Sequence, residues 1–238
     1  MSRIEALLKT TRARLKAAAD PEFEAGLRWY FKEPVNPYGV RTPLLRELAR
    51  LAYREVKAWP LAERDRFVTE LWKSGMLEEG NIVCHLYRRF AKSCGEREFV
   101  MFEQWINRYV RNWSHCDGVS TWLIAASIQN RPGLADRLAH WTKSKNRWKR
   151  RSAAVSLIQE AKRGGNTETI FHICGLLLDD RDDMVQKGVG WLLKETYPKR
   201  PREMLGFLDP WRPSAPRLVL RLAAEKMTEK DKRWLLKK

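Results

Sequence analysis

The sequence predicts an all-α protein, an α-solenoid of about six two-helix repeats with a basic concave face. Three observations support this fold class: strand signals are nearly absent, apolar residues recur at helical spacing, and a pattern returns about every 35 residues. Of the 238 residues, 44% are hydrophobic and 32% charged, which is typical of a folded chain. We therefore expect a single domain over residues 1–238, with the solenoid core at about residues 20–225.

The clearest predicted helix begins at Thr42 and Pro43, with the threonine as N-cap and the proline in the first turn. Its apolar residues recur at i, i+3, i+4 and i+7, at Leu44, Leu45, Leu48, Leu51 and Ala52. The same spacing predicts helices over residues 61–74, 80–92, 96–111, 119–129 and 153–163.

An internal repeat becomes visible when the sequence is aligned with itself. Residues 146–157 align with residues 182–193 at an offset of 36, which pairs Arg151 with Lys187. An offset of 35 brings Trp113 onto Trp148, and weaker copies begin near residues 43, 81 and 215. This period suits stacked two-helix units whose equivalent positions line one face.

The net charge identifies the class of partner. The sequence has 46 basic and 29 acidic residues, a balance of +17, and a pI near 10.0. Nucleic acid is the partner we expect, and an acidic membrane surface or an acidic protein is the alternative. The N-terminal residues do not read as a signal peptide, and no stretch approaches the roughly 18 apolar residues of a membrane span. We therefore expect a cytoplasmic protein that does not enter a membrane.

The cysteines and histidines lack the spacing of a disulfide framework or of a metal site. They are Cys84, Cys94, Cys116, Cys174, His85, His115, His140 and His172. We expect the cysteines to be reduced and buried, and we expect no metal and no cofactor.

The densest positive charge lies in residues 141–151, which include Lys149, Arg150 and Arg151 and no acid. Because this stretch runs through a turn into a helix, we expect it to contact phosphates. The alternative is a solvated turn followed by a charged helix face.

Three of the eleven tryptophans stand beside these basic positions. Trp113, Trp148 and Trp191 lie at or near the same phase of consecutive repeats, where rings would touch sugar or base while cations hold phosphates. The other eight are expected to fill the core or the grooves between helices. These are Trp29, Trp59, Trp72, Trp105, Trp122, Trp141, Trp211 and Trp234.

One carboxylate belongs to this set. Asp117 follows Trp113 by four residues, so both share a helical face. Asp117 is either the N-cap of a helix that begins at Gly118 or a carboxylate that faces a cationic substrate.

Three segments together resemble the AlkD-like DNA alkylation repair glycosylases. They are YGVRTPLLRELA at residues 38–49, the Trp113-x-x-x-Asp117 pair, and VQKGVGWLLKE at residues 185–195. The resemblance covers roughly residues 20 to 225 and implies HEAT-like helical repeats. It implies hydrolysis of the N-glycosidic bond of cationic N3- or N7-alkylated purines in duplex DNA, with the damaged base left stacked. It further implies a base excision repair enzyme associated with the nucleoid, which we expect to be a monomer.

The resemblance also implies roles for residues. Asp117, Trp113 and Trp191 take the catalytic positions, and Lys194 stands where the family has an arginine. The residues expected to contact DNA are Arg151, Lys194, Lys187, Arg150, Lys149, Trp148, Tyr30 and Arg41.

Three positions depart from the family pattern. Asp183 and Met184 stand where relatives tend to have aromatic residues, and Arg41 stands where some have a neutral amide. Other functions are a non-catalytic binder of damaged or branched DNA, a protein-binding scaffold, and an RNA-binding protein. In an active enzyme, Asp117 either stabilises charge or orients the attacking water.

Overall fold

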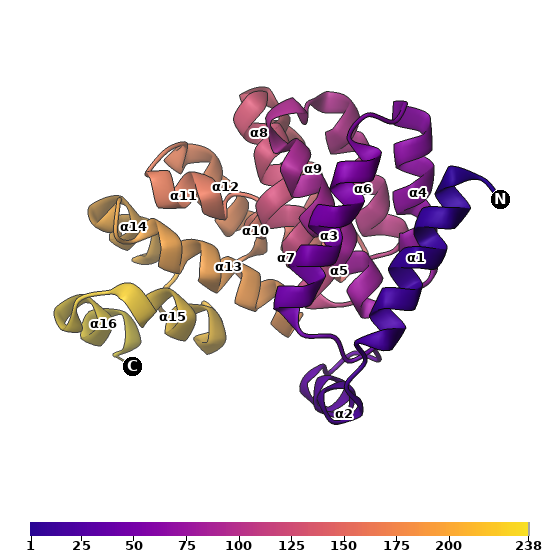
Figure 1. Ribbon diagram of the computed structural model, residues 1–238. Helices are drawn as coiled ribbons and strands as arrows, with labels where there is room; N and C mark the ends of the chain where they lie inside the picture. Colours follow the sequence, from indigo (N-terminus) through magenta and orange to yellow (C-terminus); the bar gives the residue numbers. More distant parts are fainter. Residues whose placement is uncertain (238) are drawn as a thin grey trace. The chain divides into compact units, whose positions relative to one another are not determined.

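The computed structural model describes residues 1–237 and consists of helices joined by short connections (Figure 1). Those residues contain no β-strand, only an isolated bridge between Asn36 and Met76. The α-helices are α1 (Arg3–Ala17), α2 (Pro21–Tyr30), α3 (Thr42–Val56), α4 (Leu61–Lys73), α5 (Leu77–Tyr87), α6 (Glu96–Arg108), α7 (Trp113–Gly118), α8 (Ala125–Asn130), α9 (Leu138–Trp141), α10 (Arg147–Val155), α11 (Ile158–Arg163), α12 (Thr167–Leu177), α13 (Asp183–Thr196), α14 (Pro201–Leu208), α15 (Arg217–Ala223) and α16 (Glu229–Leu236). Short 3-10 segments are η1 (Arg88–Ser93), η3 (Pro132–Arg137) and η4 (Ala224–Lys226), and η2 (Val119–Ile124) is a π-helix. The predicted all-α class is confirmed, and no helix in the described part of the chain is long and apolar enough to cross a membrane.

The chain divides into two compact units. The first consists of Met1–Lys92 and Arg108–Gly118, and the second of Ser93–Asn107 and Val119–Lys238. The expectation of one domain over residues 1–238 stays a prediction.

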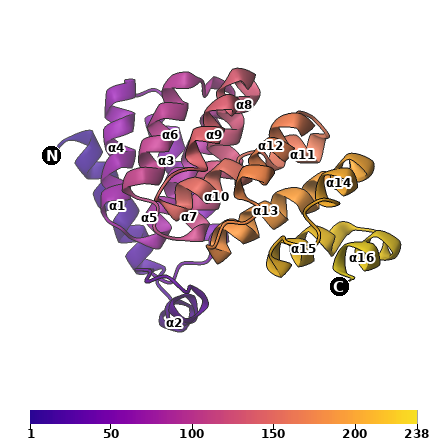
Figure 2. The same cartoon turned by 180° about the vertical axis from the view of Figure 1, so that it is seen from behind.

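Six helices begin at almost constant intervals along the chain. They are α3, α5, α7, α10, α13 and α15, which start at Thr42, Leu77, Trp113, Arg147, Asp183 and Arg217. The steps between these starts are 35, 36, 34, 36 and 34 residues. Consecutive members pack together, α3 on α5 and α5 on α7 in the first unit, and α10 on α13 and α13 on α15 in the second (Figure 2). The fold is therefore the predicted solenoid of helical repeats, and we call these six the repeat helices.

The fifth residue of every repeat helix is polar or charged. In chain order these residues are Arg46, Asn81, Asp117, Arg151, Lys187 and Arg221. The predicted equivalence of Arg151 and Lys187 is confirmed, and four of the six positions are basic. Trp113 and Trp148 lie near the same phase, as predicted, because they are the first residue of α7 and the second of α10. The prediction is wrong for Trp191, which is the ninth residue of α13.

Several predicted helix boundaries shift. Arg41, not Thr42, precedes the first turn of α3, and it makes no side-chain cap hydrogen bond. The helix predicted over residues 153–163 is instead two helices, because a turn at Ser156 and Leu157 separates α10 from α11. The helix predicted over residues 80–92 begins earlier, at Leu77, because two acidic residues in its first turn favour the positive end of the helix.

Close helix contacts and buried apolar side chains hold each unit together. In the second unit, a Cβ added at Gly190 would lie 2.7 Å from the Leu222 Cβ, so α13 and α15 approach more closely than any larger residue permits. All four cysteines are buried thiols, as expected. Trp29, expected to fill a groove, is instead 88% exposed, because α2 buries none of its residues.

Candidate active site and nucleic-acid interface

The helix that carries Trp113 and Asp117 has its N-cap one residue before Trp113. The Asn112 side chain accepts a hydrogen bond from the His115 backbone N–H at 2.9 Å, and the Asn112 carbonyl accepts one from Cys116 at 3.1 Å. Asn112 is therefore the cap, and Asp117 lies inside a helical run that continues through η2 and α8. The interpretation of Asp117 as an N-cap is wrong. The π-helix that begins two residues after Asp117, at Val119, is of a kind frequent at functional sites.

An aromatic cluster holds the Trp113 indole in the first unit. Phe31 stacks on it with ring centroids 5.0 Å apart and planes inclined by 12°, and Tyr30 meets it edge-on at 5.9 Å. Phe31 is buried with Val35 and Leu77, and Trp113 packs against that cluster while remaining partly exposed. One face of the indole is therefore fixed by packing.

His115 fixes the position of α7 against α5, and the sequence analysis missed this role. Its Nε2 lies 2.8 Å from the Leu77 carbonyl, and its Nδ1 lies 3.2 Å from the Asn112 amide nitrogen. Since an amide NH₂ donates and a carbonyl accepts, the proton sits on Nε2. Burial lowers the pKa of His115 to about 4, although the bond to Leu77 acts in the opposite direction. The Asn-x-x-His spacing of a capped helix start was the available sequence signal.

Gly80 makes room for this imidazole. A Cβ at Gly80 would lie 2.5 Å from the His115 Nε2, so α5 presents bare backbone to the ring. The neighbouring Ser114 hydroxyl donates to the Asn81 side chain at 3.1 Å. Trp113 and Asp117 are thus carried by a helix whose register on α5 is set by buried polar contacts.

Two buried glutamates of α5 hold the loop between α2 and α3. The Glu78 carboxylate accepts hydrogen bonds from the backbone N–H groups of Tyr38, Gly39 and Val40 at 2.8, 2.9 and 3.0 Å. Glu79 accepts a bond from the Tyr38 hydroxyl at 2.7 Å, and burial together with this bond raises the pKa of the phenol. These contacts explain the Tyr-Gly-Val segment of the first family motif, which leads directly into α3.

A positive φ and a close approach both require a glycine in this loop. Gly39 has φ +82°, and a Cβ there would lie 2.3 Å from the Asp20 carbonyl oxygen. The exposed Arg41 guanidinium pairs with Asp20 at 3.1 Å and lies 4.7 Å above the Phe23 ring. Arg41, expected to contact DNA, is therefore held against α2.

Trp191 lies one turn before Glu195 on α13, in the second unit. The Glu195 carboxylate accepts a hydrogen bond from the Lys226 ammonium at 2.6 Å. Burial alone would raise the pKa of Glu195, but Lys226, with smaller effects of Lys162 and Trp191, outweighs it and lowers the pKa. Trp191 remains partly exposed on α13.

Three cations of the basic stretch have acidic partners in the fold, which the sequence alone did not predict. The ion pairs are Arg147–Asp182 (2.9 Å), Lys149–Glu103 (2.8 Å) and Arg150–Asp180 (2.7 Å), and on α13 Lys187 pairs with Asp183 (3.1 Å). Lys194 likewise pairs with Glu225 at 2.7 Å. The acids that pair with the stretch and with Lys187 come from α6, from the α12–α13 connection and from α13, and the expected contact of the stretch with phosphates stays a prediction. Asp183, which departs from the family pattern, is one of these acidic partners.

Two of the expected DNA contacts are buried. Arg151 and Trp148 each expose 5% of their surface. The Arg151 guanidinium donates to the Met184 carbonyl at 2.6 Å, and Arg147 lies 5.1 Å above the Trp148 ring. Both side chains pack α10 against its neighbours and offer little surface to a ligand. Their contact with DNA stays a prediction.

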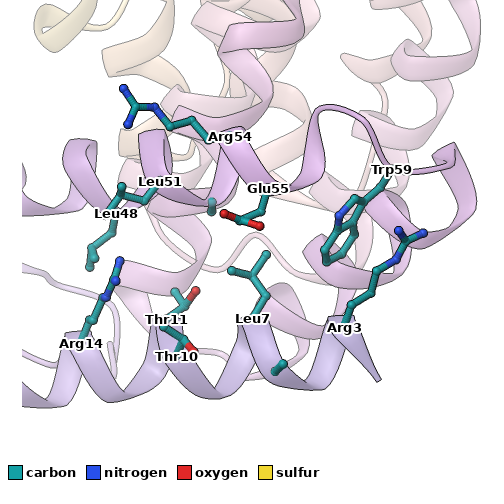
Figure 3. A pocket seen from close by; sticks show the side chains of 12 residues that line it. Arg3, Leu7, Thr10, Thr11, Arg14, Leu48, Leu51, Arg54, Glu55 and Trp59 are labelled. Carbon is teal, nitrogen blue, oxygen red and sulfur yellow. The ribbon is translucent and has the colours of Figure 1, made fainter. Parts of the chain in front are cut away.

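A separate groove of about 600 Å³ lies between α1 and α3 (Figure 3). Arg3, Arg14 and Arg54 line it together with Glu55, so its charges are mixed. None of the predicted site residues lines it. Within residues 1–237, no group of three His, Cys, Asp or Glu side chains could hold a metal ion.

Comparison with known proteins identifies the family. The family model for the DNA alkylation repair enzyme matches residues 11–227. The chain is similar to a solved structure described as a predicted DNA alkylation repair enzyme from Enterococcus faecalis, at 16% identity and a TM-score of 0.80, over 89% of this chain and 97% of that one. It is also similar to smu.31 from Streptococcus mutans UA159, at 18% identity and a TM-score of 0.60, over 77% and 91% of the two chains. At these identities the two structures show a shared fold, and a comparison with curated proteins gives no match. The family model spans most of the sequence, so the chain belongs to the DNA alkylation repair enzyme family and is a DNA-binding enzyme of DNA repair.

Proposed function

We propose that this enzyme is a DNA glycosylase that hydrolyses the N-glycosidic bond of cationic N3- or N7-alkylated purines in duplex DNA. The observation that carries the proposal is the placement of Trp113 and Asp117 on α7. Asn112 caps that helix, and Asp117 lies within it, one turn after Trp113. Trp113 is braced on one face by Phe31.

The chemistry suits a carboxylate and an aromatic face. Alkylation at N7 puts a full positive charge on the purine and weakens the glycosidic bond. As the bond breaks, the charge shifts to an oxocarbenium-like sugar and the base leaves neutral. A carboxylate about 4 Å from that sugar stabilises the charge by up to about 4 kcal/mol at an effective dielectric near 20. If that stabilisation is specific to the transition state, the rate rises about a thousandfold.

Two tryptophans and four basic residues have further roles in the proposed reaction. Trp113 and Trp191 act on the deoxyribose, because their π faces attract the developing cation. Selectivity then comes from the charge of the lesion, and the base stays in the stack. Lys187, Lys194, Arg150 and Arg151 bind phosphates, and Asp183, Glu225 and Asp180 must then release or share the first three. With about six phosphates neutralised, log affinity falls against log salt with a slope near −5.

Release of free base from duplex DNA containing N7-methylguanine tests the proposal. The variants are Asp117→Asn and a matched control, Asp136→Asn, which makes the same chemical change at an exposed carboxylate of η3. We expect the wild type and the control to release base, and Asp117→Asn to be slower by a factor of ten or more at equal DNA occupancy.

Two results would contradict the proposal. If the wild type binds the damaged duplex and releases no base, the protein is a non-catalytic binder. Efficient excision of uracil, an uncharged base, would show that lesion charge does not determine selectivity.

A further inference from the structure

A second positively charged site lies in the first unit, outside the residues discussed so far. It is a pocket of about 460 Å³ lined by Arg46 of α3, His85 of α5, and Arg88 and Arg89 of η1. We call it the arginine pocket. All three of its arginines are exposed, and His85 is partly buried.

The charge of the arginine pocket is not balanced from within. No acidic residue is among its lining residues. Arg46 and Arg89 form no ion pair with any carboxylate of residues 1–237, and Arg89 lies 5.6 Å above the Tyr53 ring. In the basic stretch of the second unit, by contrast, Lys149 and Arg150 are paired with acids. The guanidinium groups of Arg46 and Arg89, which form no ion pair, favour an anion.

The positive charge of the arginine pocket also affects the pKa of His85. Burial lowers the pKa of His85 to about 4, with Arg46, Arg88 and Arg89 adding to the effect. The imidazole is therefore neutral at pH 7 and lines the pocket without adding to its positive charge. It also provides a probe within the pocket, because its ring resonances respond to any anion bound there.

We propose that the arginine pocket binds a phosphate group, and that this group is a backbone phosphodiester of the bound DNA. The proposal rests on the DNA-binding function of the enzyme. Planar guanidinium groups match the oxygens of a phosphate in a two-pronged geometry, which a single ammonium does not.

Arg46 of the arginine pocket and Asp117, the proposed catalytic carboxylate, occupy equivalent positions in their repeat helices. Arg46 is the fifth residue of α3, as Asp117 is of α7, and α5 packs between these two helices. Packed helices lie roughly 8–10 Å apart, so two steps separate Arg46 from α7 by about 16–20 Å. At about 3.4 Å per nucleotide of one strand, that distance corresponds to about five nucleotides. The pocket therefore holds the backbone away from the lesion and contributes affinity rather than chemistry.

The salt dependence of binding to an undamaged duplex tests the proposal without requiring catalysis. The full-length variant is Arg46→Ala/Arg89→Ala. The matched control is Arg54→Ala/Arg14→Ala, which removes two exposed arginines from the mixed-charge groove of Figure 3. We expect the pocket variant to bind about tenfold more weakly, with a salt slope smaller in magnitude by about one. We expect the control to keep the wild-type slope.

The His85 ring resonances separate the two sources of phosphate. They are followed by NMR in the wild type during titration with the duplex and, separately, with inorganic phosphate, and His85→Gln identifies the signals. Movement with DNA together with the smaller slope supports the proposal. Movement with inorganic phosphate alone, with an unchanged slope, overturns the assignment to DNA. No movement with either anion overturns the phosphate site itself.

This experiment can fail independently of the proposed glycosylase. If the pocket variant has a smaller salt slope and the wild type releases no base, the phosphate site is supported and the glycosylase proposal is contradicted. If the wild type releases base, the salt slope of the pocket variant is unchanged and the His85 resonances do not move, the glycosylase proposal is supported and the phosphate site is contradicted.

Discussion

Phe31 stacks on Trp113, with ring centroids 5.0 Å apart and planes inclined by only 12°. Phe31 follows α2 as its C-cap, and Trp113 begins α7, so the stack joins two segments that are far apart in the sequence. If Trp113 acts on the deoxyribose, Phe31 determines how rigidly it is presented.

Replacement of Phe31 by leucine is expected to slow base release more than it weakens the fold. The change keeps an apolar side chain but removes the ring face behind Trp113, so we expect a loss of about 1 kcal/mol in the free energy of unfolding. Urea unfolding and single-turnover base release measure the two effects. Phe99→Leu, at a buried phenylalanine 5.3 Å from Trp141 in the second unit, is the control. Equal rate losses in the two variants at matched stability would remove the special role of Phe31.

His115 is expected to make the protein less stable in mild acid. Its pKa in the folded state is about 4, below the ordinary value of 6.5, because burial disfavours the charged ring. Between those values the unfolded chain binds more protons, so stability is complete above pH 6.5 and is lost as the pH falls toward 4. The contribution lost between pH 7 and pH 5 is on the order of 2 kcal/mol.

Urea unfolding of the wild type and of His115→Gln at both pH values checks this expectation. The variant should be less stable at pH 7, because the bonds to Leu77 and Asn112 are disturbed, and its stability should change less between the two values. The same pH dependence in both proteins would show that another group is responsible.

Lys226 is expected to support Trp191 through Glu195. Lys226→Met leaves the Glu195 carboxylate without its ammonium partner, and Glu195 lies one helical turn after Trp191 on α13. We expect base release to fall severalfold with DNA affinity retained, and stability to fall by about 1 kcal/mol, since solvent screens the exposed lysine. Lys232→Met removes a lysine from an exposed pair with Glu229 and should change neither quantity. A rate equal to that of the wild type would show that Trp191 does not depend on this contact.

Gly190 and Gly188 of α13 are expected to respond differently to alanine. At Gly190 the added Cβ would lie 2.7 Å from the Leu222 Cβ and 3.1 Å from the Val219 carbonyl, so we expect a loss of about 1–3 kcal/mol. At Gly188 the nearest atoms lie at 3.3 Å, and the higher helix propensity of alanine, worth about 1 kcal/mol, offsets most of the strain. Thermal unfolding of the two variants compares them directly. A Gly190→Ala protein as stable as Gly188→Ala would contradict the close packing of α13 on α15.

The sequence alone determined the all-α class, the repeat length and the family, because each of these rests on local patterns. The helical spacing of apolar residues can be recognised within a few turns of sequence. The interval from Arg151 to Lys187 is found by aligning the chain with itself. The Trp113–Asp117 pair is likewise legible because four residues make one helical turn. Only the tertiary structure decided which charged side chains have a partner of opposite charge. Glu103 neutralises Lys149 from another helix, whereas no carboxylate among residues 1–237 pairs with Arg46. The buried contacts of His115 with Leu77 and of Glu78 with Gly39 also join residues almost forty positions apart. No local pattern encodes such contacts, since they form only when packing brings distant segments together and removes water from between them.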